Sequence, residues 1–230
     1  MDGFSTSSTD GGKAGASVGA PQPTVIVSGS AGRLPSSVAL GLLEARVDSA
    51  DGAVLVVSEA SPTSPIQKLT AEPLALDRDA LVVVDCRQRG GSAELDAGRV
   101  RRVPPEGSAL AVDREVRDGL DWLAEQGIER RHFLFDSLAL GGPLPDADAV
   151  YDLAYELAMT VGAEDGLGAV AVDSDGLSTE EVGRLGHLFD VHVELERDET
   201  GPQMRWTGLL GGSDSWVPVE QVDFESTDFR

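Results

Sequence analysis

The chain has 230 residues and carries 40 acidic against 18 basic side chains, a formal net charge of −22. This length is enough for one α/β domain with a buried core. The charge opposes binding to nucleic acid or to anionic membranes, because affinity for phosphate backbones comes from Lys and Arg. No apolar run is long enough to cross a membrane, and no secretory signal opens the chain. We therefore expect a cytoplasmic protein with no membrane or nucleic-acid partner.

The basic residues are almost all arginine, since Lys13 and Lys68 are the only lysines. An acidic, lysine-poor surface stays soluble in molar salt, where self-repulsion is screened within roughly 3 Å. We interpret the composition as that of a halophilic archaeon that accumulates salt. The alternative is an acidic cytosolic protein without such adaptation.

Metal and disulfide chemistry find little support in the sequence. Cys86 is the only cysteine, which excludes an internal disulfide and a cysteine-based zinc site. The three histidines, at 132, 187 and 192, have no metal-ligand spacing. We expect Cys86 to be a buried thiol beside a strand-end Asp85, although Arg87 and Arg89 are close enough in sequence to stabilise a thiolate.

The chain opens with a leader at 1–22, rich in Gly, Ser, Thr and Ala, which is typical of disorder. Short aliphatic strands follow, predicted at 24–27, 53–57, 81–84, 132–135 and 168–172. Helices are predicted at 65–72, 113–126 and 146–161, as well as one that begins at Pro35 and one that follows the capping box Ser178–Glu181. A hairpin at 191–209 and an acidic tail at 220–230 complete the chain.

Strands that are apolar throughout and alternate with helices are typical of a parallel sheet covered on both faces. We expect a three-layer α/β fold, a mainly parallel sheet flanked by helices, with a C-terminal antiparallel hairpin. In such sheets ligands bind at the carboxyl ends of the strands. Polar residues follow several of these ends: Ser28 and Gly29, Ser58 and Glu59, Asp85, and Asp136 with Ser137.

The first strand, a Gly/Ser turn and a helix start follow one another, which is the order that forms a phosphate cradle. Candidate phosphate-binding residues are Gly29, Ser30, Gly32, Ser36 and Ser37. The frame G-x-x-x-x-G-K-[ST], counted from Gly29, places Leu34 at the second glycine and Pro35 at the lysine. Only Ser36 is in register. The alternative is that the glycines serve only a tight strand-to-helix turn.

Four stretches carry a family resemblance: VIVSGSAGRLPSS, VLVVSEASP, HFLFDSLAL, and GLGAVAVDSDGLSTEEVGRLGHLFDVHVELE followed by MRWTGLLGGSDSWVPV. Over residues 23–219 the chain resembles the RecA-like ATPase core of the KaiC-like branch, and most closely its divergent haloarchaeal domains. The resemblance implies that Glu59 is the first of two carboxylates that polarise the attacking water. Ala60 replaces the second. It also implies that Asp136, with Ser36, holds Mg²⁺.

Pro35 at the lysine position argues against catalysis, because the lysine and Mg²⁺ stabilise the charge that develops during phosphoryl transfer. We therefore expect a non-catalytic RecA/KaiC-like domain without a cofactor, a regulatory or interaction partner of another protein or of itself. The alternative is an ATP-binding protein or ATPase that uses Mg²⁺ with Ser36, Glu59 and Asp136. The arginines Arg99, Arg101 and Arg102 either bind an acidic partner or pair with nearby carboxylates.

Overall fold

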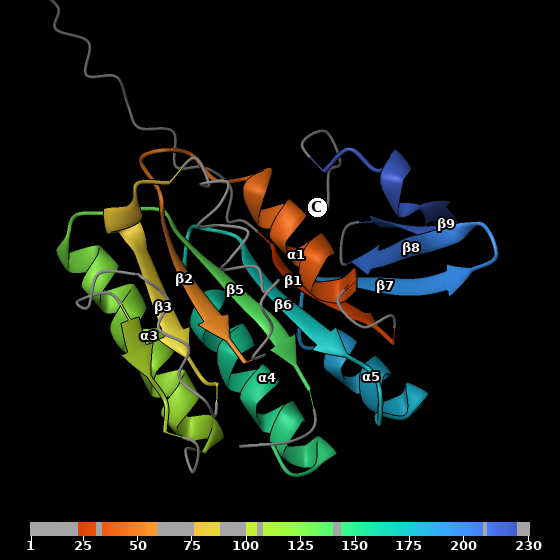
Figure 1. The fold of residues 1–230 in the computed structure, drawn as a ribbon, viewed down its shortest axis with the longest axis horizontal. Coiled ribbons are helices and arrows are strands. Elements are labelled where there is room, and N and C mark those ends of the chain that lie inside the picture. The colour runs from red at the N-terminus through yellow and green to blue at the C-terminus, as the bar shows by residue number, and fades with distance from the viewer. Residues whose placement is uncertain are drawn as a thin grey trace, which may run out of the picture.

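The computed structural model describes residues 23–30, 34–58, 76–87, 100–104, 108–139, 144–208 and 211–224. Within this part, one nine-stranded sheet has the order β4-β3-β2-β5-β6-β1-β7-β8-β9 (Figure 1). The strands are β1 (Thr24–Gly29), β2 (Gly52–Val57), β3 (Leu81–Asp85), β4 (Val100–Arg102), β5 (Arg131–Leu138), β6 (Gly168–Asp173), β7 (Val191–Asp198), β8 (Gly201–Gly208) and β9 (Gly211–Pro218). The expected α/β architecture is confirmed. Neighbouring strands run parallel in the part of the sheet ordered β4-β3-β2-β5-β6-β1-β7, whereas the pairs β7–β8 and β8–β9 are antiparallel.

Helices cover both faces of the sheet. They are α1 (Leu34–Glu44), α3 (Ala109–Glu125), α4 (Ala147–Val161) and α5 (Thr179–Gly186), with short 3-10 turns η1 (Arg78–Ala80) and η2 (Val219–Gln221). In Figure 1, α1 lies in front of the sheet and the other three helices lie behind it. Alternate side chains of the interior strands therefore enter two cores: Val25 and Val27 pack on the α1 side, whereas Ile26 packs with α3, α4 and α5. No helix of the described residues is long and apolar enough to cross a membrane.

Three helix signals in the sequence are confirmed by their caps. Asp146 accepts a hydrogen bond from Ala149 N (2.9 Å) and begins α4. Ser178 and Glu181 form the reciprocal capping box of α5. Gly127, with φ of 80°, follows the end of α3. A left-handed residue at this position favours glycine, which has no Cβ to clash.

The start of α3 differs from the prediction. The helix begins at Ala109 after Ser108, four residues before the predicted N-cap Asp113. Asp113 is buried inside the helix, where Thr160 Oγ1 donates to it (3.2 Å) and Arg117 Nε donates to it (2.8 Å). Its carboxylate therefore joins α3 to α4 instead of capping a helix.

Two strands of the sheet were not predicted. Val100–Arg102 forms β4 at one edge of the sheet, and Gly211–Pro218 forms β9 at the other. After β9, Val222 and Phe224 pack against the α1-side core, so the first residues of the predicted tail contact the domain. The predicted leader at 1–22, the predicted helix at 65–72 and residues 225–230 lie outside the described residues.

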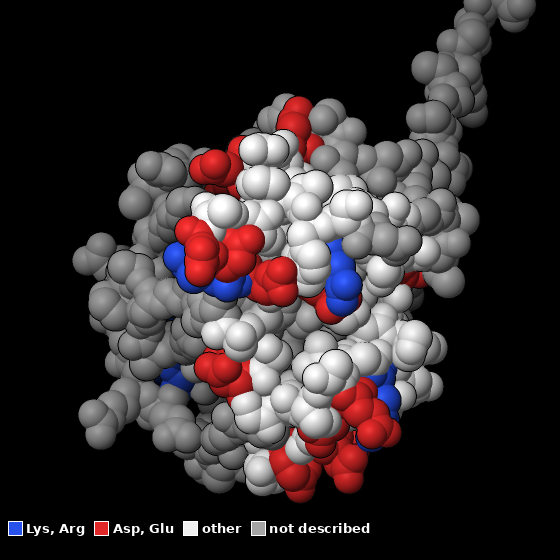
Figure 2. Space-filling view, turned by 90° about the vertical axis from the view of Figure 1, so that its right-hand side faces the viewer, with Lys and Arg blue, Asp and Glu red and all other residues white. Residues whose placement is uncertain are grey.

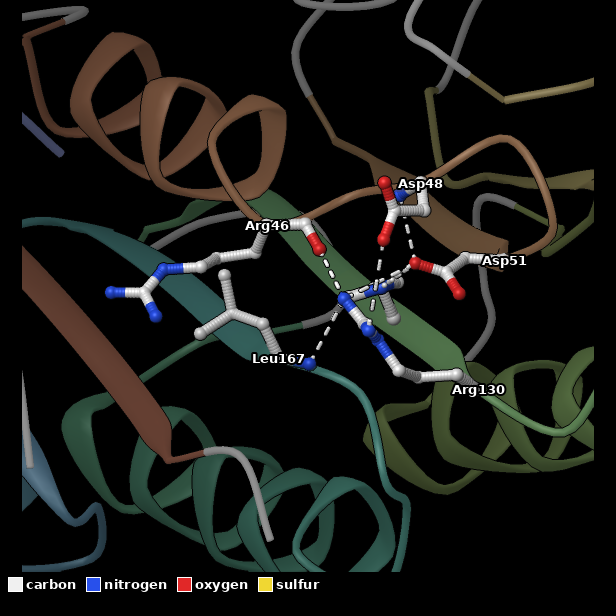
Figure 3. A network of polar contacts seen from close by, with 6 residues as sticks. Arg46, Asp48, Asp51, Arg130 and Leu167 are labelled. Carbon is white, nitrogen blue, oxygen red and sulfur yellow. Dashed lines mark hydrogen bonds and ion pairs between the residues drawn. The ribbon is translucent and has the colours of Figure 1, made fainter. Parts of the chain in front are cut away.

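A polar network at the amino ends of β2, β5 and β6 fixes the edge opposite to the expected ligand site (Figure 3). Leu167 N donates to His132 Nδ1 (3.0 Å), so the ring proton lies on Nε2, which donates to Asp51 Oδ2 (3.1 Å). Arg130 also pairs with Asp51 (3.3 Å) and donates to the main-chain oxygen of Arg46. Burial lowers the pKa of the fully enclosed His132, although Asp51 acts in the opposite direction. The imidazole is therefore a neutral structural bridge.

Candidate functional site

The carboxyl ends of β2 and β5 and the first turn of α1 meet at one point of the sheet edge. Ser58 follows β2, Asp136 lies near the end of β5, and Ser36 lies in α1. Of the predicted site residues, the structure brings Ser36 and Asp136 into direct contact. Ser58, which was predicted only as a polar strand end, completes the cluster.

The Ser36 hydroxyl and Asp136 Oδ1 of this cluster bond to neighbouring strands of the fold. The Ser36 hydroxyl donates to the main-chain oxygen of Asp136, and Ser36 is only 8% exposed. The Asp136 carboxylate, on a residue 3% exposed, accepts from Ser58 N (2.8 Å) and Ser58 Oγ (2.9 Å) through the same Oδ1. The cluster thus joins α1, β2 and β5 through side chain to main chain bonds.

Gly29 at the end of β1 is required by strand packing. A Cβ on this residue would lie 2.9 Å from both the Cβ and the main-chain oxygen of Leu195 on β7. This close approach of β1 and β7 accounts for the glycine without any phosphate, by strand packing and not by the tight turn of the alternative interpretation. Ser30 and Ser37 are exposed. Gly32 and Glu59 lie outside the described residues.

The described residues of this edge do not fit a magnesium-bound triphosphate. Pro35 is buried in the first turn of α1, at the position where a phosphate-binding lysine is needed, and Leu34 packs against the α1-side core. The hydroxyl of Ser36, which would ligate the metal, is directed to a main-chain carbonyl. No group of three or more His, Cys, Asp or Glu side chains among the described residues has the geometry of a metal site. No step of nucleotide chemistry follows from this arrangement.

Cys86 is not an activated thiol. Burial raises its pKa to about 12, and the charges of Asp136 and Asp85 add to this effect. Arg87, which could have stabilised a thiolate, instead pairs with both oxygens of Asp85 (2.8 and 2.9 Å). Burial raises the pKa of Asp85, but the bonds and charge of Arg87 outweigh it and the net pKa is lowered. The thiol therefore stays protonated at neutral pH.

Within the arginine group, Arg101 pairs with carboxylates of its own chain. Arg101 Nη1 lies 2.9 Å from Glu115 and 3.3 Å from Asp118, both on α3. Partial burial raises the pKa of Glu115, but hydrogen bonds from Arg101 and Arg114 lower it by more. Arg101 thus attaches β4 to α3, in agreement with the pairing alternative. Arg99 lies outside the described residues.

Comparison with known proteins shows a family and a similar fold, but no activity. Residues 23–195 match the model of a family of unknown function (DUF7504). No curated protein matches the chain. Among solved structures, it is similar to the uncharacterized protein PH0321 of Pyrococcus horikoshii, which was crystallised in complex with an unknown peptide. The two share 11% sequence identity with a TM-score of 0.56, over 82% of this chain and 84% of the other. A likeness at this identity concerns the fold alone.

Proposed function

The chain belongs to the family of unknown function DUF7504, and we propose that it is a non-catalytic RecA/KaiC-like domain that binds another protein. It acts in the cytoplasm of a halophilic archaeon as a regulatory partner, either of an active relative or of a second copy of itself. Fold alone does not confer this role, so the argument rests on the site.

The observation that carries the proposal is that Ser36 and Asp136 form hydrogen bonds that connect α1, β5 and the end of β2. Both would be needed to hold Mg²⁺, yet the Ser36 hydroxyl binds a main-chain carbonyl and Asp136 binds Ser58 of the neighbouring strand. Pro35 supplies no positive charge for a phosphate. A buried polar cluster of this kind stabilises the sheet edge. A partner protein would then bind elsewhere, on the surface of the domain.

The peptide in the structure of PH0321 supports an interaction role, since it was found on a protein of similar fold. The acidic surface supports the halophilic setting. Figure 2 shows acidic side chains in several clusters on the face at the right of Figure 1, with a few basic ones beside them. Such a surface repels itself in dilute buffer and is screened in molar salt.

The second candidate function is ATP binding with an unorthodox phosphate loop. The observation in its favour is that Ser36 and Asp136, two widely separated residues of the Walker-like pattern, contact each other. In this alternative, both side chains exchange their present partners for the metal and its water shell.

Phosphate release in about 2 M KCl discriminates between the two candidates. We expect no release from Mg²⁺–ATP above the rate of a buffer blank, and no nucleotide-dependent shift of the melting temperature. Turnover that is lost in Asp136→Ala but retained in Asp173→Ala, a change at a neighbouring strand end, would overturn the proposal in favour of the ATPase.

A further inference from the structure

A hollow of about 430 Å³ lies between α5 and the surface of β7 and β8, on the face of the sheet opposite α1. Among the described helices on that face, α5 is the last, and β8 and β9 continue beyond it (Figure 1). The volume is in the range of small-ligand pockets, about 300–1,000 Å³. The hollow is separate from the carboxyl-edge cluster, whose residues do not line it.

Two glycines of α5 shape this hollow. A Cβ on Gly186 would lie 2.4 Å from His192 Nδ1, so the close packing of α5 on this ring requires glycine. A Cβ on Gly183 would meet no atom within 4 Å. Glycine destabilises a helix relative to alanine, and packing does not require it at 183. Its effect is to keep the hollow open.

His192 lies in the wall of the hollow and is held by a hydrogen bond to β1. Its Nε2 and the hydroxyl of the buried Ser28 share this bond, at 2.8 Å. Burial lowers the pKa of His192, so the ring is neutral at neutral pH.

The charge of the lining is negative. Asp190 lines the hollow, and its Oδ2 accepts from the main-chain nitrogen and the hydroxyl of Thr24, both at 2.8 Å. Glu194 also lines the hollow, and Arg205 pairs with it (3.1 and 2.8 Å) while lying over the ring of Trp216 (4.7 Å). Among the described lining residues there is no Lys or Arg. Val182 and Phe189 provide the apolar part of the wall.

We propose that this hollow binds a basic side chain, lysine or arginine, presented by a partner protein. The cationic head pairs with Asp190, and the aliphatic stem lies along Val182 and Phe189. Molar salt screens long-range attraction, but a pair inside a hollow is screened much less. This inference rests on the proposed interaction role and names its chemistry. The two claims can fail separately. Probe binding tests the hollow, whereas nucleotide turnover tests the proposed function at the carboxyl edge of the sheet.

Nuclear magnetic resonance of the labelled full chain in about 2 M KCl tests the proposal. The probes are Nα-acetyl-lysine amide and Nα-acetyl-arginine amide, with Nα-acetyl-norleucine amide as the neutral control. We expect saturable shifts of the His192, Gly183 and Thr207 resonances with a Kd of about 1 mM for a probe of this size. The norleucine probe should bind at least tenfold more weakly.

Two variants at one position supply the matched control. Gly183→Leu places a larger side chain, whose Cβ meets no atom within 4 Å, at the wall of the hollow. Binding should therefore weaken at least tenfold while the circular dichroism spectrum is retained. Gly183→Ala adds one methyl group in open space and should bind as the natural chain does. Equal binding of the norleucine probe, absence of shifts at about 50 mM, or unchanged binding in Gly183→Leu would each overturn the proposal.

Discussion

Asp136 is buried at the end of β5, and its carboxylate holds both the main-chain nitrogen and the hydroxyl of Ser58. Replacing Asp136 with alanine leaves the main-chain nitrogen of Ser58 without its carboxylate acceptor, whereas the Ser58 hydroxyl keeps the main-chain oxygen of Ser137 (2.5 Å). A hydrogen bond to a charged group contributes about 1.5–3 kcal/mol. We expect Asp136→Ala to lower the free energy of unfolding by about 2–4 kcal/mol. Urea denaturation in about 2 M KCl measures it.

The matched control for Asp136 is another strand-end aspartate at the same edge. Asp173 ends β6 and accepts an exposed bond from Asp175 N (3.0 Å). Asp173→Ala should cost less than about 1 kcal/mol, because water replaces the lost partner. Equal losses of unfolding free energy in the two variants would mean that the bonds of Asp136 do not stabilise this edge of the sheet.

His132 makes the stability depend on pH. Its pKa in the folded chain is below the ordinary value of 6.5 because the ring is buried. As the pH falls, the unfolded chain takes up this proton first, so stability is present above about pH 6.5 and is lost toward the lower folded-state pKa. His132→Gln should reduce the slope of unfolding free energy against pH between about 6.5 and 5.

The natural chain, measured over the same pH range, is the reference for this variant. Unfolding free energies that do not fall below pH 6.5 in the natural chain would contradict the assignment of a neutral, buried His132. His192 is shifted in the same direction, so His132→Gln should remove only part of the slope.

At the scale of elements, replacing glycine with alanine in α5 should change the free energy of unfolding in opposite directions at positions 183 and 186. Gly183→Ala adds a Cβ in open space and should raise the free energy of unfolding by about 0.5–1 kcal/mol, the difference in helix propensity. Gly186→Ala should lower it, because its Cβ would lie 2.4 Å from a ring nitrogen that Ser28 holds in place. Thermal melts of both variants measure the effect. The same sign for both would show that the α5–β7 contact adapts.

Which elements could be predicted follows from the kind of signal each carries. The five aliphatic strands and the caps at Asp146 and Ser178 depend on local chemistry, and their positions in the sequence were sufficient. The start of α3 was wrong because Asp113 has the residue type of an N-cap, and only the fold places Thr160 and Arg117 around it. The strand β9, with the sequence GGSDSWVP, lacks alternation and depends on pairing with β8.

The candidate site was partly predictable for the same reason. Strand ends at 58 and 136 share an edge in any parallel sheet, so Asp136 could be placed there from sequence. That its partner is the main chain of Ser58 depends on which strands are neighbours. The hollow beside α5 had no sequence signal, since Gly183, Asp190 and His192 come together only through packing.

At the scale of the whole molecule, the net charge of −22 predicts that stability rises with salt. Self-repulsion among 40 acidic residues falls as the screening length decreases from about 10 Å in 0.1 M salt to about 3 Å in 1 M. We expect the melting temperature to increase between about 0.2 and 3 M KCl. A decrease over this range would contradict adaptation to a salt-rich cytoplasm.

The most direct test of a non-catalytic carboxyl edge is equilibrium dialysis of the full chain against labelled ATP and Mg²⁺ in about 2 M KCl. If Ser36 and Asp136 have only a structural role, no saturable retention of nucleotide occurs up to about 1 mM. A dissociation constant above this concentration is weaker than that of ordinary cofactor binding. Stoichiometric retention that is lost in both Ser36→Ala and Asp136→Ala, while each variant remains folded, would contradict this account.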